Sequence, residues 1–215
     1  MSPTIFSELT RRLDQRRGAC ALIAIKARAR CKSRLAQVLA TADRIELVRC
    51  MLTAVLAAAR AAKTVRHVLV VSPERDGVPG AVPVLADSGG SLNRALTQAQ
   101  TVLGDSGWRE LVILPADLPN VSAAEIDALV HAGRTGGFAI APDDAQSGTN
   151  ALYLGSPSPF HFQFGPDSKR LHLEEARRLG LTPEEVHLSG LQFDVDSPRD
   201  LRRLQEQRWL ARLQA

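Results

Sequence analysis

Three aspartates close two apolar segments, and they are the residues of this chain best suited to chemistry. Asp117 follows four consecutive apolar residues, 111–114, the pattern of a strand buried on both faces of a parallel sheet. Asp194 and Asp196 close a second apolar segment, 191–195, and side chains two apart on an extended chain point the same way. Ligands of open α/β sheets bind beyond the carboxyl ends of the strands, so a carboxylate there can hold a metal ion against a phosphate. A solvated loop explains a lone aspartate equally well, but the second carboxylate cluster favours a site.

Cations gather directly after the first apolar segment, 20–25. Residues 26–34 contain five of them, at Lys26, Arg28, Arg30, Lys32 and Arg34. After the first strand of an α/β sheet such a loop is placed to grip phosphates, although a solvated charged loop is the plainer interpretation. A glycine turn at 87–96 enters a helix that runs to residue 103, and bare amides at such a start can bind an anion or a base edge.

The remaining elements must position these groups. Apolar runs predict strands at 20–25, 67–72, 82–85, 111–114, 138–142, 150–154, 186–188 and 191–195. Capping signals predict helices that begin at Asp43 (with Glu46), Ser122 (with Glu125), Ser168 and Ser197-Pro198. Strands and helices mostly alternate, which is typical of a three-layer α/β/α domain with a mostly parallel central sheet. No helix separates strands 138–142 and 150–154, so a small antiparallel insertion is expected there.

Length and composition limit the classes of protein. The 215 residues, 45% hydrophobic, can bury a core as one domain, 20–215, preceded by an amphipathic helical extension, 1–19. A net charge of +4 suits an anionic small molecule as well as nucleic acid, but 4% aromatic residues leave little for base stacking. Three cysteines without CxxC spacing favour a reducing compartment over a zinc site. No apolar run is long enough for a membrane span or a secretion signal, so we expect a cytoplasmic protein that binds neither membrane nor nucleic acid. Its first and last helices could form a homodimer.

Six short segments, in this order along the chain, resemble the 2-phospho-L-lactate guanylyltransferases of the CofC/FbiD type. The segments are Lys26 with 32–35 (KSRL), 91–96 (SLNRAL), 114–119 (LPADLP), 148–152 (GTNAL), 164–168 (FGPDS) and 194–198 (DVDSP). The resemblance covers about residues 20–205 and implies a GT-A-like, Rossmann-related nucleotidyltransferase fold. It also implies the transfer of GMP from GTP to 2-phospho-L-lactate, phosphoenolpyruvate or 3-phosphoglycerate, in the biosynthesis of the deazaflavin coenzyme factor 420. The family usually has a glycine where this chain has Ser91.

The resemblance implies a role for each candidate residue. Asp117, Asp194 and Asp196 would bind Mg²⁺, the expected cofactor, with oxygen ligands of the hardness that this ion prefers. Lys26, Lys32, Arg34 and Asp117 would be the catalytic groups, the cations neutralising the triphosphate and the leaving pyrophosphate. Thr149, Gly165 and Ser168 would hold the acceptor, and the nucleotide would contact Ala24, Lys26, Gly90, Leu92, Asn93 and Pro115. No protein nucleophile is required, and none of the five histidines is assigned to the site because no HxH or HxxxH pair occurs.

Two other classes remain open. A sugar-phosphate or molybdopterin nucleotidyltransferase would share the fold and the aspartates, but it would favour a glycine-rich loop where this chain has 26–34. A non-enzymatic basic binding module would not need carboxylates at the ends of buried strands.

Overall fold

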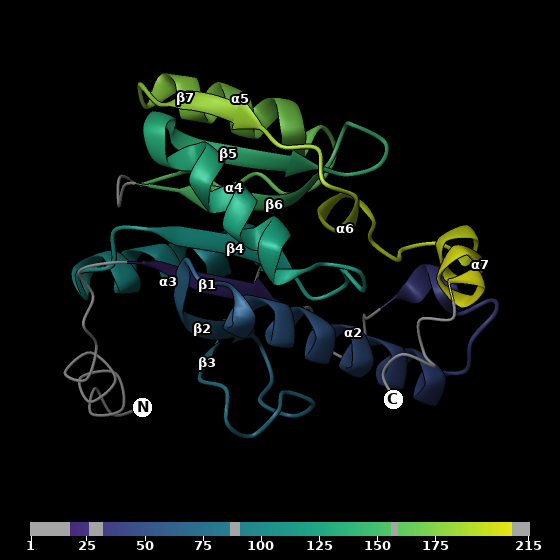
Figure 1. The fold of residues 1–215 in the computed structure, drawn as a ribbon. Helices are drawn as coiled ribbons and strands as arrows, with labels where there is room; N and C mark the ends of the chain where they lie inside the picture. Colours follow the sequence, from purple (N-terminus) through teal and green to yellow (C-terminus); the bar gives the residue numbers. More distant parts are fainter. Residues whose placement is uncertain (1–17, 26–31, 87–90, 156–158, 208–215) are drawn as a thin grey trace.

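A seven-stranded mixed sheet runs through the part of the chain that the computed structural model describes, residues 18–25, 32–86, 91–155 and 159–207 (Figure 1). The strand order is β3-β2-β1-β4-β6-β5-β7. Only β6 runs against its neighbours, since its pairings with β4 and β5 are antiparallel and all the other pairings are parallel. The strands are β1 (Ala19–Ala24), β2 (Val65–Ser72), β3 (Val84–Ala86), β4 (Leu111–Pro115), β5 (Gly137–Pro142), β6 (Thr149–Leu154) and β7 (Thr182–Glu185). This confirms the mostly parallel sheet with a small antiparallel insertion.

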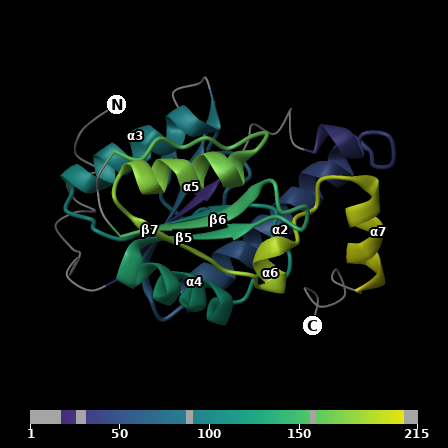
Figure 2. The same ribbon diagram turned by 90° about the horizontal axis from the view of Figure 1, so that it is seen from above.

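Helices cover both faces of the sheet (Figure 2). One face carries α2 (Thr41–Ala61) and α4 (Ala123–Gly136), and the other carries α3 (Leu92–Asp105) and α5 (Ser168–Arg178). The short η2 (Ser33–Leu35), α6 (Ser189–Gln192) and α7 (Pro198–Glu206) lie beyond the sheet, where α7 packs on the start of α2. The predicted three-layer α/β/α architecture is therefore confirmed.

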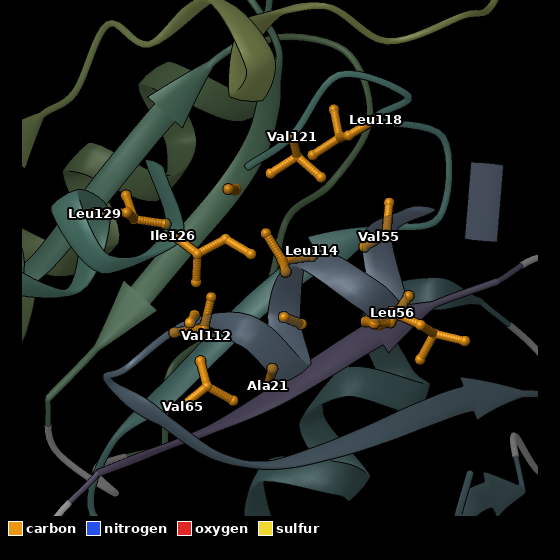
Figure 3. Close-up of a cluster of buried hydrophobic side chains, with 14 of the residues drawn as sticks. Ala21, Val55, Leu56, Val65, Val112, Leu114, Leu118, Val121, Ile126 and Leu129 are labelled. Atoms are coloured by element: carbon orange, nitrogen blue, oxygen red, sulfur yellow. The ribbon is translucent and has the colours of Figure 1, made fainter. Parts of the chain in front are cut away.

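Strands β1 and β4 form the centre of the core because they are apolar on both faces. Ala21 and Leu114 point toward α2 and α4, as Figure 3 shows, while Leu22 and Ile113 point toward α3 and α5. All four are at most 1% exposed. Full burial of a leucine or isoleucine side chain stabilises the fold by about 1.5–3 kcal/mol. The residues that directly follow these two strands are therefore held in fixed positions.

The direction of β6 decides which residues meet at the functional edge. Ala24 pairs with Pro115, so β1 and β4 end level with each other. Pro142 ends β5 opposite Thr149, the first residue of the antiparallel β6. The start of β6 therefore joins the carboxyl ends of β1, β4 and β5 at one edge.

Two predicted strands are wrong. The chain at 191–195 begins as α6 and then continues without sheet pairing, although Leu191 and Val195 are fully buried. The strand predicted at 186–188 lies earlier, as β7, whose sequence TPEE carries no strand signal. Pairing with β5 defines β7, and an edge position tolerates its proline.

Two helix starts also differ from the prediction, and two agree with it. Helix α2 begins at Thr41 with Ala40 as N-cap, so Asp43 lies in the first turn, and Glu46 binds Arg49 instead of closing a capping box. In helix α5 the N-cap position is occupied by Asp167, whose side chain makes no capping hydrogen bond, and Ser168 is the first helical residue. The capping boxes of Ser122 with Glu125 and of Ser197 with Asp200 both form, and Pro198 is the first residue of α7 as predicted.

Within the described residues, none of the helices combines the length and the apolar character needed to cross a bilayer. The predicted extension at 1–19 lies almost wholly outside the described residues.

Candidate active site

The three predicted aspartates lie together at the carboxyl edge of the sheet. Asp117 follows β4, while Asp194 and Asp196 follow α6, and one ligand oxygen of each lies within 4.8 Å of the others. The buried strand β4 fixes Asp117, and burial of Val195 between the other two fixes Asp194 and Asp196. Segments 77 residues apart thus form one carboxylate cluster, the aspartate cluster.

Lys32 places its ammonium group inside the aspartate cluster. Its Nζ donates to Asp117 Oδ2 and, at 2.7 Å, to Asp196 Oδ1, with only 8% of its side chain exposed. Burial alone would lower the pKa of Lys32, but the two carboxylates outweigh that effect and raise it. Arg34 lies farther out, because its guanidinium is 3.9 Å from Asp196 and its side chain is 77% exposed.

Asp194 is the most enclosed member of the cluster. Burial, followed by the charges of Asp117 and Asp196, raises the pKa of Asp194 to about 7. Asn150 Nδ2 donates to Gln192 O at 2.9 Å and lies 3.4 Å from Asp194 Oδ1, so it ties the start of β6 to this segment. A further cation near Asp194 would stabilise its ionised form.

A cavity of about 280 Å³ opens beside the cluster. Ten of the residues predicted for the site line it: Ala24, Lys32, Leu92, Pro115, Asp117, Thr149, Gly165, Ser168, Asp194 and Asp196. Arg34 and Asn93 do not line it, and Lys26 and Gly90 lie outside the described residues. The structure therefore brings together the predicted metal and acceptor residues and three of the six predicted nucleotide residues.

The starts of β6 and α5 also form part of the cavity wall. Thr149 is the first residue of β6, and Ser168 is the first residue of α5. Gly165, three residues before α5, has a φ of +136°, a backbone conformation that favours glycine. The side chains of Thr149 and Ser168 are buried, at 9% and 2% exposure. At this helix start the backbone N–H groups of Ser168 and Lys169 already donate to Gly165 O at 3.3 Å and to Ser147 O at 3.1 Å, so the side-chain hydroxyl groups are the donors that this wall offers to an anion.

Asn93 connects α3 to this wall. Its Nδ2 donates to Phe164 O at 3.1 Å, and Phe164 N donates to its Oδ1 at 2.8 Å. The amide that was predicted to contact the nucleotide thus holds the segment just before Gly165. Ser91, where the family usually has glycine, caps α3 by accepting from Arg94 N.

Sequence reasoning missed three residues of this region. Asn150 is the second residue of β6 and is buried. The signal available in the sequence was an amide at the start of the apolar GTNAL segment. Asp143 lines the cavity and accepts from the backbone N–H groups of Ser147 and Gly148 at 3.0 and 2.9 Å. His172 is fully buried against Thr149, and no spacing in the sequence indicates this.

The arrangement is suited to anionic substrates. Carboxylates, a lysine and two hydroxyl side chains line the same cavity. Within the described residues that line the cavity, no cysteine or serine–histidine pair is available for covalent catalysis.

The fold is also found in solved nucleotidyltransferase structures. A structure from Desulfovibrio desulfuricans G20, described as a nucleotide-diphospho-sugar transferase, matches with a TM-score of 0.73 at 18% identity, over 86% of this chain and 85% of that one. At this identity the likeness defines the class of fold alone.

Sequence comparison narrows that class to one family. Residues 19–205 match the family described as "Guanylyl transferase CofC like". A phosphoenolpyruvate guanylyltransferase of Rubrobacter xylanophilus is 40% identical over 191 residues, which cover 86% of this chain and 92% of the relative. A 3-phospho-D-glycerate guanylyltransferase of Phenylobacterium zucineum is 32% identical over 188 residues, 84% of this chain and 86% of the relative. The chain belongs to the CofC-like guanylyl transferase family.

Proposed function

We propose that this protein transfers GMP from GTP to the phosphate of a small phospho-acid and releases pyrophosphate. The observation that carries the proposal is the cavity itself, which is lined by the aspartate cluster and Lys32 together with Thr149, Gly165 and Ser168. Relatives named for phosphoenolpyruvate and for 3-phospho-D-glycerate support the guanylyl group and the class of acceptor. Phosphoenolpyruvate is the first acceptor to test, because the relative at 40% identity bears its name.

The donor set fits Mg²⁺ as cofactor. Three carboxylates with oxygens within 4.8 Å of one another are hard ligands of the kind this ion takes, and the ammonium of Lys32 already occupies a cation position between two of them. Asp117, Asp194 and Asp196 would hold the ion. When bound, Mg²⁺ supplies charge neutralisation for the phosphates of the nucleotide and the acceptor.

The chemistry joins two polyanions, so charge and position are the main contributions of the protein. A phosphate oxygen of the acid attacks the α-phosphorus of GTP; the new O–P bond forms as the bond to the β-phosphate bridging oxygen breaks, and pyrophosphate leaves with that electron pair. Lys32 stabilises charge on the phosphates from the side of Asp117 and Asp196. Thr149 and Ser168, which line the same cavity, orient the acceptor and hold its phosphate near the reacting centre.

Product analysis tests this proposal. Full-length protein with Mg²⁺ is incubated with GTP and each of the three acids separately, with ATP, CTP and UTP in parallel, and products are identified by ³¹P NMR. We expect GTP and at least one acid to give an unsymmetrical diphosphate diester together with pyrophosphate. Products formed only with a sugar phosphate or a pterin would contradict the proposal and indicate a different nucleotidyltransferase.

We further propose that the product enters the biosynthesis of the deazaflavin coenzyme factor 420. Support comes from the six segments that resemble the 2-phospho-L-lactate guanylyltransferases. A strain that lacks the gene and still makes the coenzyme at the normal level would contradict this placement.

A further inference from the structure

A buried histidine stands directly behind the acceptor wall. His172, on α5, has no exposed surface, and both of its ring nitrogens have partners. Its Nδ1 lies 3.0 Å from Thr149 Oγ1, and its Nε2 lies 2.9 Å from the backbone nitrogen of Gln163. The ring also packs edge-on against Phe164, with centroids 4.8 Å apart, so its orientation is fixed from three sides.

The contact with Gln163 determines the tautomer. A backbone N–H can only donate, so Nε2 must be the unprotonated nitrogen that accepts. The neutral ring then carries its proton on Nδ1 and donates it to Thr149 Oγ1. Burial keeps the ring neutral, since it lowers the pKa of His172 to about 4 despite the opposing charge of Glu175.

This tautomer has a consequence for Thr149. Because its oxygen accepts from His172, the hydroxyl proton of Thr149 is turned away from the ring and is available to another acceptor. Among the described residues, no other hydrogen bond of this hydroxyl is present. Thr149 lines the cavity together with Gly165 and Ser168, so a bound molecule is the natural recipient of the proton.

We propose that His172 is a positioning residue that fixes Thr149 as a hydrogen-bond donor toward an anionic oxygen of the phospho-acid. The inference rests on the proposed function, because it concerns the acceptor of that reaction. A hydroxyl that accepts a hydrogen bond from the ring points its own proton toward the cavity. It therefore binds a carboxylate or phosphate oxygen of a ligand better than a ligand group that can only donate. Specificity for an acid would therefore depend on a side chain that never touches the substrate.

Two substitutions of similar size separate the two hydrogen bonds of His172. The amide of His172→Asn overlies Nδ1 and keeps a donor to Thr149, whereas the amide of His172→Gln overlies Nε2 and keeps an acceptor for Gln163. Both variants lose packing, so thermal unfolding is measured first to confirm that each is folded. We expect His172→Gln to raise KM for the phospho-acid about tenfold, with KM for GTP and kcat near wild type, and His172→Asn to stay near wild type in all three.

A double-mutant cycle with Thr149→Val tests whether His172 acts through the hydroxyl. In the valine background His172→Gln should raise the acceptor KM no further. Additive effects, or an equal rise in the KM for GTP, would overturn the inference.

A measurement without substrate keeps this test separate from the proposed function. Long-range ¹⁵N–¹H NMR of the free protein reports which ring nitrogen of His172 carries the proton. Protonated Nδ1 supports the inference and protonated Nε2 overturns it, whichever reaction the protein catalyses. If the wild-type protein formed no product with GTP and any of the three acids, that result would contradict the proposed function instead.

Discussion

At the scale of single residues, the aspartate cluster is held together by one lysine. Three carboxylates with oxygens within 4.8 Å of one another repel, and Lys32 offsets part of that repulsion from an almost fully buried position. Its ammonium group bonds Asp117 and Asp196, the same side chains that we propose as ligands of Mg²⁺. Lys32 and the proposed metal ion therefore both reduce the repulsion between the carboxylates. The free energy of unfolding of the metal-free protein should depend on Lys32.

The substitution Lys32→Met tests this dependence. In the presence of EDTA we expect the free energy of unfolding to fall by about 1–3 kcal/mol, less than for a fully buried pair because solvent screens Asp196. Adding Mg²⁺ should recover part of the loss, since it replaces the missing positive charge. Urea unfolding with and without Mg²⁺ measures both quantities.

Arg34→Met is the matched control, because Arg34 meets the same Asp196 from 3.9 Å with a side chain that is 77% exposed. It should be close to neutral in both conditions. Equal losses in the two variants, or no response of Lys32→Met to Mg²⁺, would contradict the role given to Lys32.

At the scale of elements, the short helix α6 positions two of the three residues of the aspartate cluster. Gly190 N donates to Glu125 Oε1 at 2.7 Å, and Glu125 is itself part of the capping box that starts α4. The start of α4 thus anchors α6, and α6 leads directly into Asp194.

Gly190→Ala should disturb this anchor. A Cβ there would lie 2.2 Å from Glu125 Oε2 and 2.6 Å from Asn120 O, so a loss of stability of about 1–3 kcal/mol is expected, with reduced turnover. Gly80→Ala is the control, since nothing lies within 4 Å of its Cβ. The melting temperatures of Gly190→Ala and Gly80→Ala are compared by thermal unfolding. Equal melting temperatures of the two variants would show that α6 is not anchored in this way.

The elements also separate what the sequence predicts well from what it does not. Strands β1 and β4 were predicted because continuous apolar runs leave one interpretation, and the capping boxes at Ser122 and Ser197 form because their partners are local in sequence. The segment 191–195 alternates apolar and polar residues as a strand would, but it has no neighbouring strand to pair with, and pairing is a property of the whole fold. For β7 the reverse holds, because β5 supplies the pairing that the sequence TPEE does not indicate.

The same distinction applies to the site. Asp117, Asp194 and Asp196 could be predicted because each follows an apolar run, and topology then brings them together. The contacts of Asn93 with Phe164 and of His172 with Thr149 join residues 71 and 23 positions apart, and no local pattern indicates them. The roles predicted for all the site residues, including Lys26, Gly90, Arg34 and Asn93, and the homodimer, stay predictions.

At the scale of the whole molecule, folding and the acceptor wall depend on one neutral histidine. The pKa of His172 falls from 6.5 to about 4 on folding, mainly through burial. The unfolded chain therefore takes up a proton below pH 6.5, whereas the folded protein takes it up only near pH 4. The contribution of His172 to stability should thus be complete above pH 6.5 and decline toward pH 4, by about 3 kcal/mol in total.

Unfolding by urea at several pH values, for wild type and His172→Asn, isolates this contribution from other groups that titrate in the same range. The difference in free energy of unfolding between the two proteins should narrow as pH falls from 6.5 to 4. A difference that is independent of pH would mean that the pKa of His172 is the same in the folded and the unfolded protein, and a difference that widens as pH falls would mean that folding raises it.

The most direct measurement of the central claim is pyrophosphate release by full-length protein with GTP and phosphoenolpyruvate, with Mg²⁺ and with EDTA, beside two aspartate variants. Asp117→Asn removes a negative charge from the aspartate cluster. Asp144→Asn is the control, because it removes a negative charge outside the cluster, from a half-exposed carboxylate that is paired with Arg203 at 2.5 Å. We predict release that requires both the acid and Mg²⁺, a loss on the order of 100-fold in Asp117→Asn, and a rate near wild type in Asp144→Asn. Undiminished release in EDTA, or a wild-type rate in Asp117→Asn, would contradict the assignment of the aspartate cluster as the centre of this reaction.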